Sequence, residues 1–360
     1  MSVPHSGSHH GSRPHSGFGF GPGIGTFSGR VGVRIAGTGS VLPAKTLTNE
    51  DLTKVMDTSD EWIVQRTGIR TRYITDKSKG ESTVTLAAGA LTKALADARM
   101  DADDLDLLIC ATMTPVMNCP ATANIVASMT GVKRAGSFDL NAACSGFVYG
   151  MNMAHDLIRG GAYRNIAIIG SDTLSSLMDY STAGRGTAVI FGDAAACTIF
   201  RATDDTGLGI LAQAMHANGE GWKEIFVPRE DRDFPQGMAC DPTKFNHVQM
   251  NGAAVFKFAV STFPNLIAET LEKANCKPDD IGMYICHQSN MRILLAARER
   301  FGLPEDKLYI NIDRVGNTVG ASVPLCLDEL RKSGRVKEGM KVMFLAFGGG
   351  LTWASSLWQL

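Results

Sequence analysis

The 360-residue sequence lacks an excess of charge of either sign and lacks any long hydrophobic run. Its 35 basic and 36 acidic residues give a formal net charge of −1, so the chain has no general basic field of the kind that favours nucleic acid. No apolar stretch reaches the roughly 18 residues that a membrane-spanning helix needs. We therefore expect neither nucleic acid nor a membrane as a partner.

Closely spaced cysteine pairs are also missing. The eight cysteines include no Cys-x-x-Cys pair, and most of them lie in apolar runs such as LLIC (107–110) and AAACTIF (194–200). Reduced thiols inside a protein core have this distribution, whereas zinc sites and disulfide frameworks do not. The sequence therefore predicts a cytoplasmic protein with no metal site.

What the chain does contain is a regular alternation of short apolar strands and helical stretches from Val31 onward. This alternation predicts an α/β fold with a buried sheet. Residues 1–30 differ from the rest because Gly, Ser, Pro and His dominate them, and they predict a flexible tail.

The second half of the chain echoes the first. The echo pairs 103–115 with 279–290, and 137–144 with 308–317. LLIC ends 34 residues before Cys144, and MYIC ends 31 residues before Asn317. This near-match predicts a duplicated βα unit, with an N-terminal half at 31–204 and a C-terminal half at 205–360. A pseudo-two-fold axis would then bring Cys144 and Asn317 face to face.

Cys144 lies in NAACSGF, between a strand-like and a helix-like segment. A thiol in the first turn of a helix experiences the helix dipole, which favours the thiolate, and Gly146 allows a ligand to approach closely. A buried structural cysteine is the alternative for this residue alone. His287 and Asn317 complete a Cys/His/Asn set, because each follows a strand end, where α/β proteins build their sites.

Two kinds of chemistry fit this set. A cysteine hydrolase uses Asn to orient the His. Two neutral donors aimed at one oxygen instead stabilise an enolate, and a cysteine thioester beside such a pair describes carbon–carbon condensation.

Seven motifs carry a resemblance over about Val31 to Leu360. They are GTGSVLP (37–43), DTSDEWIVQRTGIR (57–70), NAACSGF (141–147), GRGTAVIFGD (184–193), ICHQSN (285–290), GNTVGAS (316–322) and AFGGGLTWAS (346–355). In these the chain resembles the β-ketoacyl-acyl-carrier-protein synthase III family. The resemblance implies a thiolase-like α/β fold, with two duplicated halves in a five-layer α-β-α-β-α arrangement, and a homodimer.

The same resemblance implies decarboxylative Claisen condensation of an acyl-CoA primer with malonyl-acyl-carrier protein, which initiates fatty-acid synthesis. Cys144, His287 and Asn317 would be the catalytic triad, and the backbone N–H groups of Cys144 and Gly349 the oxyanion hole. Acyl-CoA would be a substrate, and no further cofactor is implied. Phe347 stands where thiolases have a second cysteine, which argues for decarboxylation rather than deprotonation, and it would form an active-site wall.

Thr58 and Glu61 of DTSDEWIVQRTGIR stand in capping-box register for a short helix that stops near Gly68. Trp62 and Arg66 then share one helix face, where they can sandwich a flat heterocycle. The resemblance implies that the CoA-binding residues are Trp62, Arg66, Thr67, Arg185, Gly252, Ser289 and Asn290.

An acidic carrier protein would need a basic docking face. The candidates are Lys257, Arg292, Arg298 and Arg300, although Glu299 interrupts them and a solvated helix surface would look the same. Cys119, just before Pro120, resembles a gate to the partner subunit's acyl pocket, and its small side chain permits longer or branched primers.

Three other interpretations stay open from the sequence. They are a related thiolase-fold acyltransferase or condensing enzyme of secondary metabolism, a cysteine hydrolase, and a catalytically idle scaffold.

Overall fold

Residues 31–360 are described by a computed structural model, and the prediction of a flexible tail at 1–30 lies outside them. Two large sheets dominate the fold. The first has the order β1 (Gly32–Val41), β7 (Ala194–Thr203), β6 (Asn165–Asp172), β4 (Leu107–Ala111), β5 (Gly136–Leu140). The second has the order β8 (Gly209–Ala217), β13 (Thr352–Gln359), β12 (Lys341–Gly348), β11 (Met283–Cys286).

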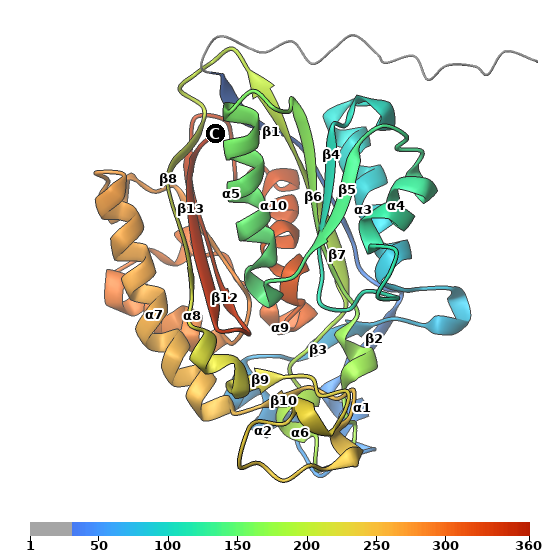
Figure 1. Cartoon of the computed structure of the whole chain (residues 1–360). Helices are drawn as coiled ribbons and strands as arrows, with labels where there is room; N and C mark the ends of the chain where they lie inside the picture. The colour runs from blue at the N-terminus through green and yellow to red at the C-terminus, as the bar shows by residue number, and fades with distance from the viewer. Residues whose placement is uncertain (1–30) are drawn as a thin grey trace, which may run out of the picture.

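The layers follow from which faces are apolar (Figure 1). Helices α3 (Thr83–Ala98) and α4 (Thr122–Thr130) cover the outer face of the first sheet, and α7 (Gly252–Lys273) and α8 (Met291–Phe301) cover that of the second. Between the sheets lie α5 (Gly146–Arg159) and α10 (Ser322–Lys332), which are buried on several sides. The predicted five-layer α-β-α-β-α fold is confirmed.

Both sheets have the same internal pairing. In each, a parallel pair of strands continues into two antiparallel neighbours: β4, β6, β7, β1 in the first sheet and β11, β12, β13, β8 in the second. The duplication read from the sequence is therefore present in the topology. The helix-like segment that the sequence places after Cys144 is confirmed as α5.

One expected repeat is reduced. Leu308 forms only an isolated bridge with Tyr284, whereas β5, its counterpart in the first half, is a strand of five residues. The buried side chain of Gln288 explains the difference, because its Oε1 accepts hydrogen bonds from the backbone N–H groups of Asn311 and Ile312. Those N–H groups are thereby removed from a strand ladder, and the chain turns into helix α9 (Ile312–Val315).

Small elements gather at the lower end of the view in Figure 1, where β12 ends and β13 begins. They are β2 (Lys45–Thr48), α1 (Asn49–Thr53), α2 (Asp60–Thr67), β3 (Thr71–Ile74), α6 (Arg185–Ala188), β9 (Ile225–Phe226) and β10 (Gln249–Met250). Within residues 31–360, no helix combines the length and apolar character needed to cross a bilayer. The cytoplasmic location stays a prediction.

Candidate active site

Cys144 lies in a single 3₁₀ turn, Ala143–Ser145, that joins the loop after β5 to helix α5. The turn is sharp: Ala143 has a φ of +46°, and its N–H donates to Oδ1 of Asn141 at 3.3 Å. The thiol is 7% exposed and lines two cavities. Gly348 lies directly against it, since a Cβ added to Gly348 would come within 2.8 Å of Cys144 Cβ.

Burial of Cys144 opposes the effect of the helix dipole, which by itself favours the thiolate. Burial raises the pKa of the Cys144 thiol to about 12, and the negative charge of Asp172 adds to the effect. Removing the thiolate charge from water is costly, and the dipole acts only over the first turn of the helix. The Cys144 thiol is therefore neutral at physiological pH.

His287 directly follows β11 and is 1% exposed. Its backbone N–H donates to Leu345 O at 2.7 Å, and its ring meets the Phe347 ring edge-on with centroids 5.7 Å apart. Burial lowers the pKa of His287 to about 3, so the imidazole is neutral at physiological pH. Among residues 31–360, Nδ1 finds no hydrogen-bond partner.

Asn317 follows Gly316, whose φ of +70° turns the chain after α9. Its Oδ1 accepts from the N–H of Val319 at 2.9 Å. Because this bond assigns the amide orientation, Nδ2 is left as the donor, and it has no acceptor in the described part of the chain. The Asn317 side chain is therefore held by one end and is free to donate with the other.

Cys144, His287 and Asn317 line one cavity of about 510 Å³, together with Phe347 and Gly349. The structure thus brings together the residues that the sequence placed in one site. A nucleophile, a neutral imidazole and a free amide donor in one apolar chamber can stabilise an anionic oxygen without a charged base.

The pairing of Cys144 with Asn317 across the duplication needs a correction. Asn141 follows Cys110 by 31 residues, as Asn317 follows Cys286, and its Oδ1 likewise accepts an N–H two residues later. Asn141 is therefore the counterpart of Asn317. The counterpart of Cys144 is Gly320, 34 residues after Cys286. The sequence comparison paired Cys144 with Asn317, whereas the residue whose backbone corresponds to Asn317 lies three positions before Cys144.

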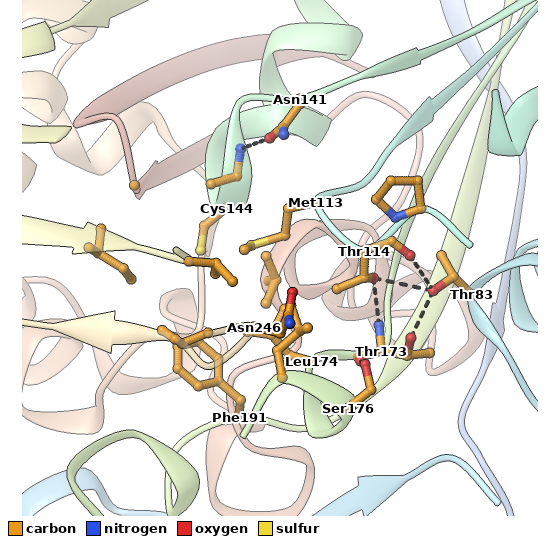
Figure 2. Close-up of a pocket in the computed structure, with 18 of the residues that line it drawn as sticks. Thr83, Met113, Thr114, Asn141, Cys144, Thr173, Leu174, Ser176, Phe191 and Asn246 are labelled. Carbon is orange, nitrogen blue, oxygen red and sulfur yellow. Dashed lines mark hydrogen bonds between the residues drawn. The ribbon is translucent and has the colours of Figure 1, made fainter. Parts of the chain in front are cut away.

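A second cavity, of about 800 Å³, extends from the other side of Cys144 (Figure 2). Apolar side chains near the thiol include Met113, Leu174 and Phe191, and threonines form part of the wall. Thr83 Oγ1 donates to Thr114 O at 2.8 Å and lies 2.8 Å from Thr173 Oγ1. The sequence analysis missed this chamber, although several of these residues follow the ends of β4 and β6, where such sites are expected.

Helix α2 carries the proposed CoA-binding aromatic residue. Its N-cap is Ser59, whose Oγ accepts from the N–H of Trp62, so the expected Thr58–Glu61 capping box is wrong by one residue. Thr58 Oγ1 is instead buried without a hydrogen bond within residues 31–360, and the extended backbone of Ser59 begins the helix. The end of the helix at Gly68 is confirmed, with a φ of +80°.

The Trp62 ring is flanked by two guanidinium groups. Arg66 lies 4.6 Å and Arg185 5.2 Å from its centroid, and Arg185 also donates to Asp57 O. Asn290 Nδ2 donates to Arg66 O at 2.9 Å and ties α8 to this helix. Six of the seven predicted CoA residues, all but Arg185, line the 510 Å³ cavity: Trp62, Arg66, Thr67, Gly252, Ser289 and Asn290.

The predicted docking residues are not equivalent. Lys257, Arg292 and Arg300 are exposed, and Arg292 packs its guanidinium 5.0 Å from the Phe256 ring centroid at the cavity wall. Arg298 is half-buried and lies 3.8 Å from Glu305, so its charge is partly offset. Cys119 is exposed and lines neither cavity that meets at Cys144, so a gate at this position would have to act on another subunit.

Comparison with known proteins gives one consistent result. Residues 138–219 match the family described as 3-oxoacyl-[acyl-carrier-protein (ACP)] synthase III, and residues 271–360 match its C-terminal domain. The β-ketoacyl-[acyl-carrier-protein] synthase III of Caldanaerobacter subterraneus subsp. tengcongensis is 44% identical over 328 residues, covering 91% of this chain and 98% of the relative.

Solved structures agree. The 3-oxoacyl-[acyl-carrier-protein] synthase III of Aquifex aeolicus has a TM-score of 0.84 and 38% identity, covering 91% of this chain and 100% of its own. A priming β-ketosynthase of a polyketide pathway has a TM-score of 0.83 and 30% identity, covering 92% and 97%. The family match and the curated relatives, such as the 44% identical one, support the fatty-acid enzyme over the secondary-metabolism, hydrolase and scaffold interpretations. The chain therefore belongs to the β-ketoacyl-acyl-carrier-protein synthase III family, thiolase-fold acyltransferases that start fatty-acid synthesis by condensation.

Proposed function

We propose that this chain condenses an acyl-CoA primer with malonyl-acyl-carrier protein through an acyl-enzyme on Cys144. The observation that carries the proposal is that Cys144 lies where two cavities meet. One cavity leads past His287 and Asn317 to the Trp62–Arg66 helix, and the other is a largely separate chamber beside the thiol. This arrangement suits a thioester whose carrier and acyl chain lie on opposite sides of the nucleophile.

In the first stage, the Cys144 sulfur attacks the thioester carbon of acyl-CoA. The carbonyl oxygen becomes negative and is stabilised by the N–H groups of Cys144 and Gly349. The bond from that carbon to the CoA sulfur then breaks, and CoA leaves with the proton that Cys144 gives up. Trp62, flanked by Arg66 and Arg185, would hold the adenine and phosphates of CoA.

In the second stage, the malonyl group loses CO₂, and the electron pair of the broken carbon–carbon bond forms an enolate. His287 and Asn317 donate hydrogen bonds to the enolate oxygen. The lowered pKa of His287 suits this role, because a neutral imidazole donates without becoming a competing acid. The enolate carbon attacks the Cys144 thioester, and the thiolate that leaves takes one proton from solvent. No base is required, and no cofactor besides the CoA thioester takes part.

The chamber beside Cys144 has room for a primer longer than acetyl. A cavity of about 150 Å³ already holds benzene, and this one has about 800 Å³. Its apolar side chains near the thiol suit an alkyl chain.

A homodimer is part of the proposal. Within residues 31–360, β5 is the last strand of the first sheet and has no neighbour on its outer edge, and it carries the exposed Phe138. Val116, Met117 and Met129 are large exposed apolar residues in the segment just before it. An unprotected edge with apolar neighbours favours pairing with a second copy, which would also bring a partner's Cys119 region to the acyl chamber.

The carrier protein would dock on the exposed Lys257, Arg292 and Arg300, of which Arg292 lines the 510 Å³ cavity. Charge attraction of this kind accelerates association and weakens with added salt.

Intact mass after incubation with a panel of acyl-CoAs tests the proposal. We expect a mass gain equal to the acyl group, lost in Cys144→Ala but retained in Cys276→Ala, a control thiol that lines neither cavity. Malonyl-acyl-carrier protein should then discharge the label as a β-ketoacyl product. Release of free acid, or no label from any CoA thioester, would overturn the proposal.

A further inference from the structure

The duplication predicts where a second copy of the catalytic turn should lie, and the structure shows what occupies it. Cys110 pairs with Ile169 in the first sheet, and Cys286 pairs with Leu345 in the second. Three residues farther on, Asp172 ends β6 and Gly348 ends β12, so these two residues correspond. Gly348 lies against Cys144, and Asp172 lies against Gly320, the counterpart of Cys144.

The two turns share their backbone conformation. Ala143 before Cys144 has a φ of +46°, and Val319 before Gly320 has a φ of +53°. On the first side, the N–H of Cys144 is the proposed oxyanion-hole donor. On the second side, the equivalent N–H of Gly320 donates to Asp172 Oδ2 at 3.0 Å. A side-chain carboxylate therefore fills the position that the substrate oxygen would take in the catalytic half.

Asp172 is fully buried and joins two parts of the site. Its Oδ1 accepts from the N–H of Met113 at 2.8 Å and from the hydroxyls of Thr112 and Thr114, both at 3.2 Å. Burial raises the pKa of Asp172 to about 6, and the hydrogen bonds from Met113, Gly320, Thr114 and Thr112 act against this rise, so the carboxyl group is mainly ionised at neutral pH. Burying a carboxylate is costly unless its oxygens are satisfied, so these donors hold it in one position.

Gly320 belongs to the turn that positions Asn317. The N–H of Val319, one residue before Gly320, donates to Asn317 Oδ1. The turn is also confined from the other side, since a Cβ on Gly170 would lie 2.1 Å from Gly320 O. The bond from Asp172 to Gly320 therefore acts on Asn317 through two adjacent residues.

We propose that Asp172 is a positioning residue for the condensation step: it holds the Val319–Ala321 turn so that Asn317 aims its free amide donor at the enolate oxygen. The proposal rests on the roles assigned above to Cys144 and Asn317. It predicts a selective defect, because acylation of Cys144 does not use Asn317, whereas condensation does.

Asp172→Asn tests it. An amide can accept from only one of the two sides that the carboxylate joins, since its NH₂ group would face the other donor. Each half-reaction is measured separately: acyl transfer to Cys144 by intact mass, and β-ketoacyl product formed from preloaded acyl-enzyme at saturating malonyl-acyl-carrier protein. We expect acylation within about threefold of the wild-type rate and condensation reduced about tenfold to a hundredfold, as for a misplaced catalytic group.

The acylation rate of Asp172→Asn distinguishes a positioning role of Asp172 from a general destabilisation of the protein. The charge of Asp172 contributes to the raised pKa of the Cys144 thiol, so its removal should not slow acylation at neutral pH. A merely destabilised protein would lose both rates together.

Asp328→Asn is the matched control. Asp328 is equally buried and accepts hydrogen bonds from the hydroxyls of Thr38 and Ser40, but it lies on α10 and lines neither cavity at Cys144. Its substitution should leave the ratio of the two rates unchanged.

Gly320→Ala provides a second variant if Asp172→Asn does not fold, because the new Cβ would lie 3.1 Å from Asp172 Oδ2 and press on the same contact. It should show the same selective loss. An unchanged ratio in both variants, or in whichever of them folds, would overturn the role of Asp172. Failure of the wild-type protein to acylate at all would instead overturn the proposed function.

Discussion

Replacing Gly348 with alanine should displace the nucleophile while leaving every proposed catalytic group in the chain. The added Cβ would lie 2.8 Å from both Cβ and N of Cys144, whereas ordinary contacts begin at 3.4 Å, so one side must move by at least 3.4 − 2.8 = 0.6 Å. Neither segment can move easily, because Gly348 ends the buried strand β12 and Cys144 lies in a turn that is packed between the two halves of the protein.

The expected magnitude follows from that displacement. A misplacement approaching 1 Å at a reacting centre costs up to about a hundredfold in rate, so acylation of Cys144 should fall roughly tenfold to a hundredfold. Overpacking of this kind also costs roughly 1–3 kcal/mol of stability. The assay is the rate of acyl transfer from acyl-CoA, followed by intact mass, with thermal unfolding measured on the same preparation.

Gly219→Ala is the control, because a Cβ at Gly219 meets nothing within 4 Å. It should keep both the rate and the stability. If Gly348→Ala acylated within about threefold of wild type while remaining folded, the close contact of Gly348 with Cys144 would not constrain the nucleophile, and the reasoning would be refuted.

Four further predictions concern the same site. Asn317→Ala should still form the acyl-enzyme but lose roughly a hundredfold in condensation, measured as product from malonyl-acyl-carrier protein, and equal loss in both half-reactions would contradict its role as enolate donor. Trp62→Ala should raise KM for acyl-CoA about tenfold and leave the discharge of preloaded enzyme unchanged; an unaltered KM would remove Trp62 from the CoA site. Because the pKa of His287 is lowered to about 3 from 6.5, its neutral state stabilises the fold above pH 6.5, and this contribution is lost as the pH falls toward 3. The free energy of unfolding, measured with urea, should therefore fall more steeply with decreasing pH in the wild type than in His287→Gln. The difference in slope should approach roughly 1.4 kcal/mol per pH unit. Parallel curves would show that His287 is not buried in its neutral form. Cys119→Phe should shorten the longest primer that labels Cys144 if this residue gates a partner's chamber, and an unchanged chain-length profile would place the gate elsewhere.

Sequence patterns were sufficient where local chemistry sets the outcome. The segment NIAIIGSD forms β6 at 165–172, because its short apolar run, residues 166–169, is most stable in a buried strand. Gly68 ends α2 for a similarly local reason, since its left-handed conformation suits glycine. Seven motifs in order were also enough to identify the family, and with it the layered fold.

Local patterns failed where a distant residue intervened. The strand expected near 308–317 is replaced by a bridge and a turn, because Gln288 binds its N–H groups from another segment. The near-match of Cys144 with Asn317 also misaligned the repeat, since functional residues need not occupy equivalent positions in the two halves. The true counterparts are Asn141 and Gly320.

The sequence by itself therefore determined most of the elements, the presence of a duplication and the family, and it predicted which residues carry the chemistry. Only the tertiary structure decided their chemical state and surroundings. Cys144 is a neutral thiol rather than a thiolate because segments far away in the chain remove it from water. Asp172 acquires its place in the site only when strand β6 and the Gly320 turn, 148 residues apart, come together. Desolvation and long-range hydrogen bonds depend on the folded arrangement of many segments, and no local pattern records them.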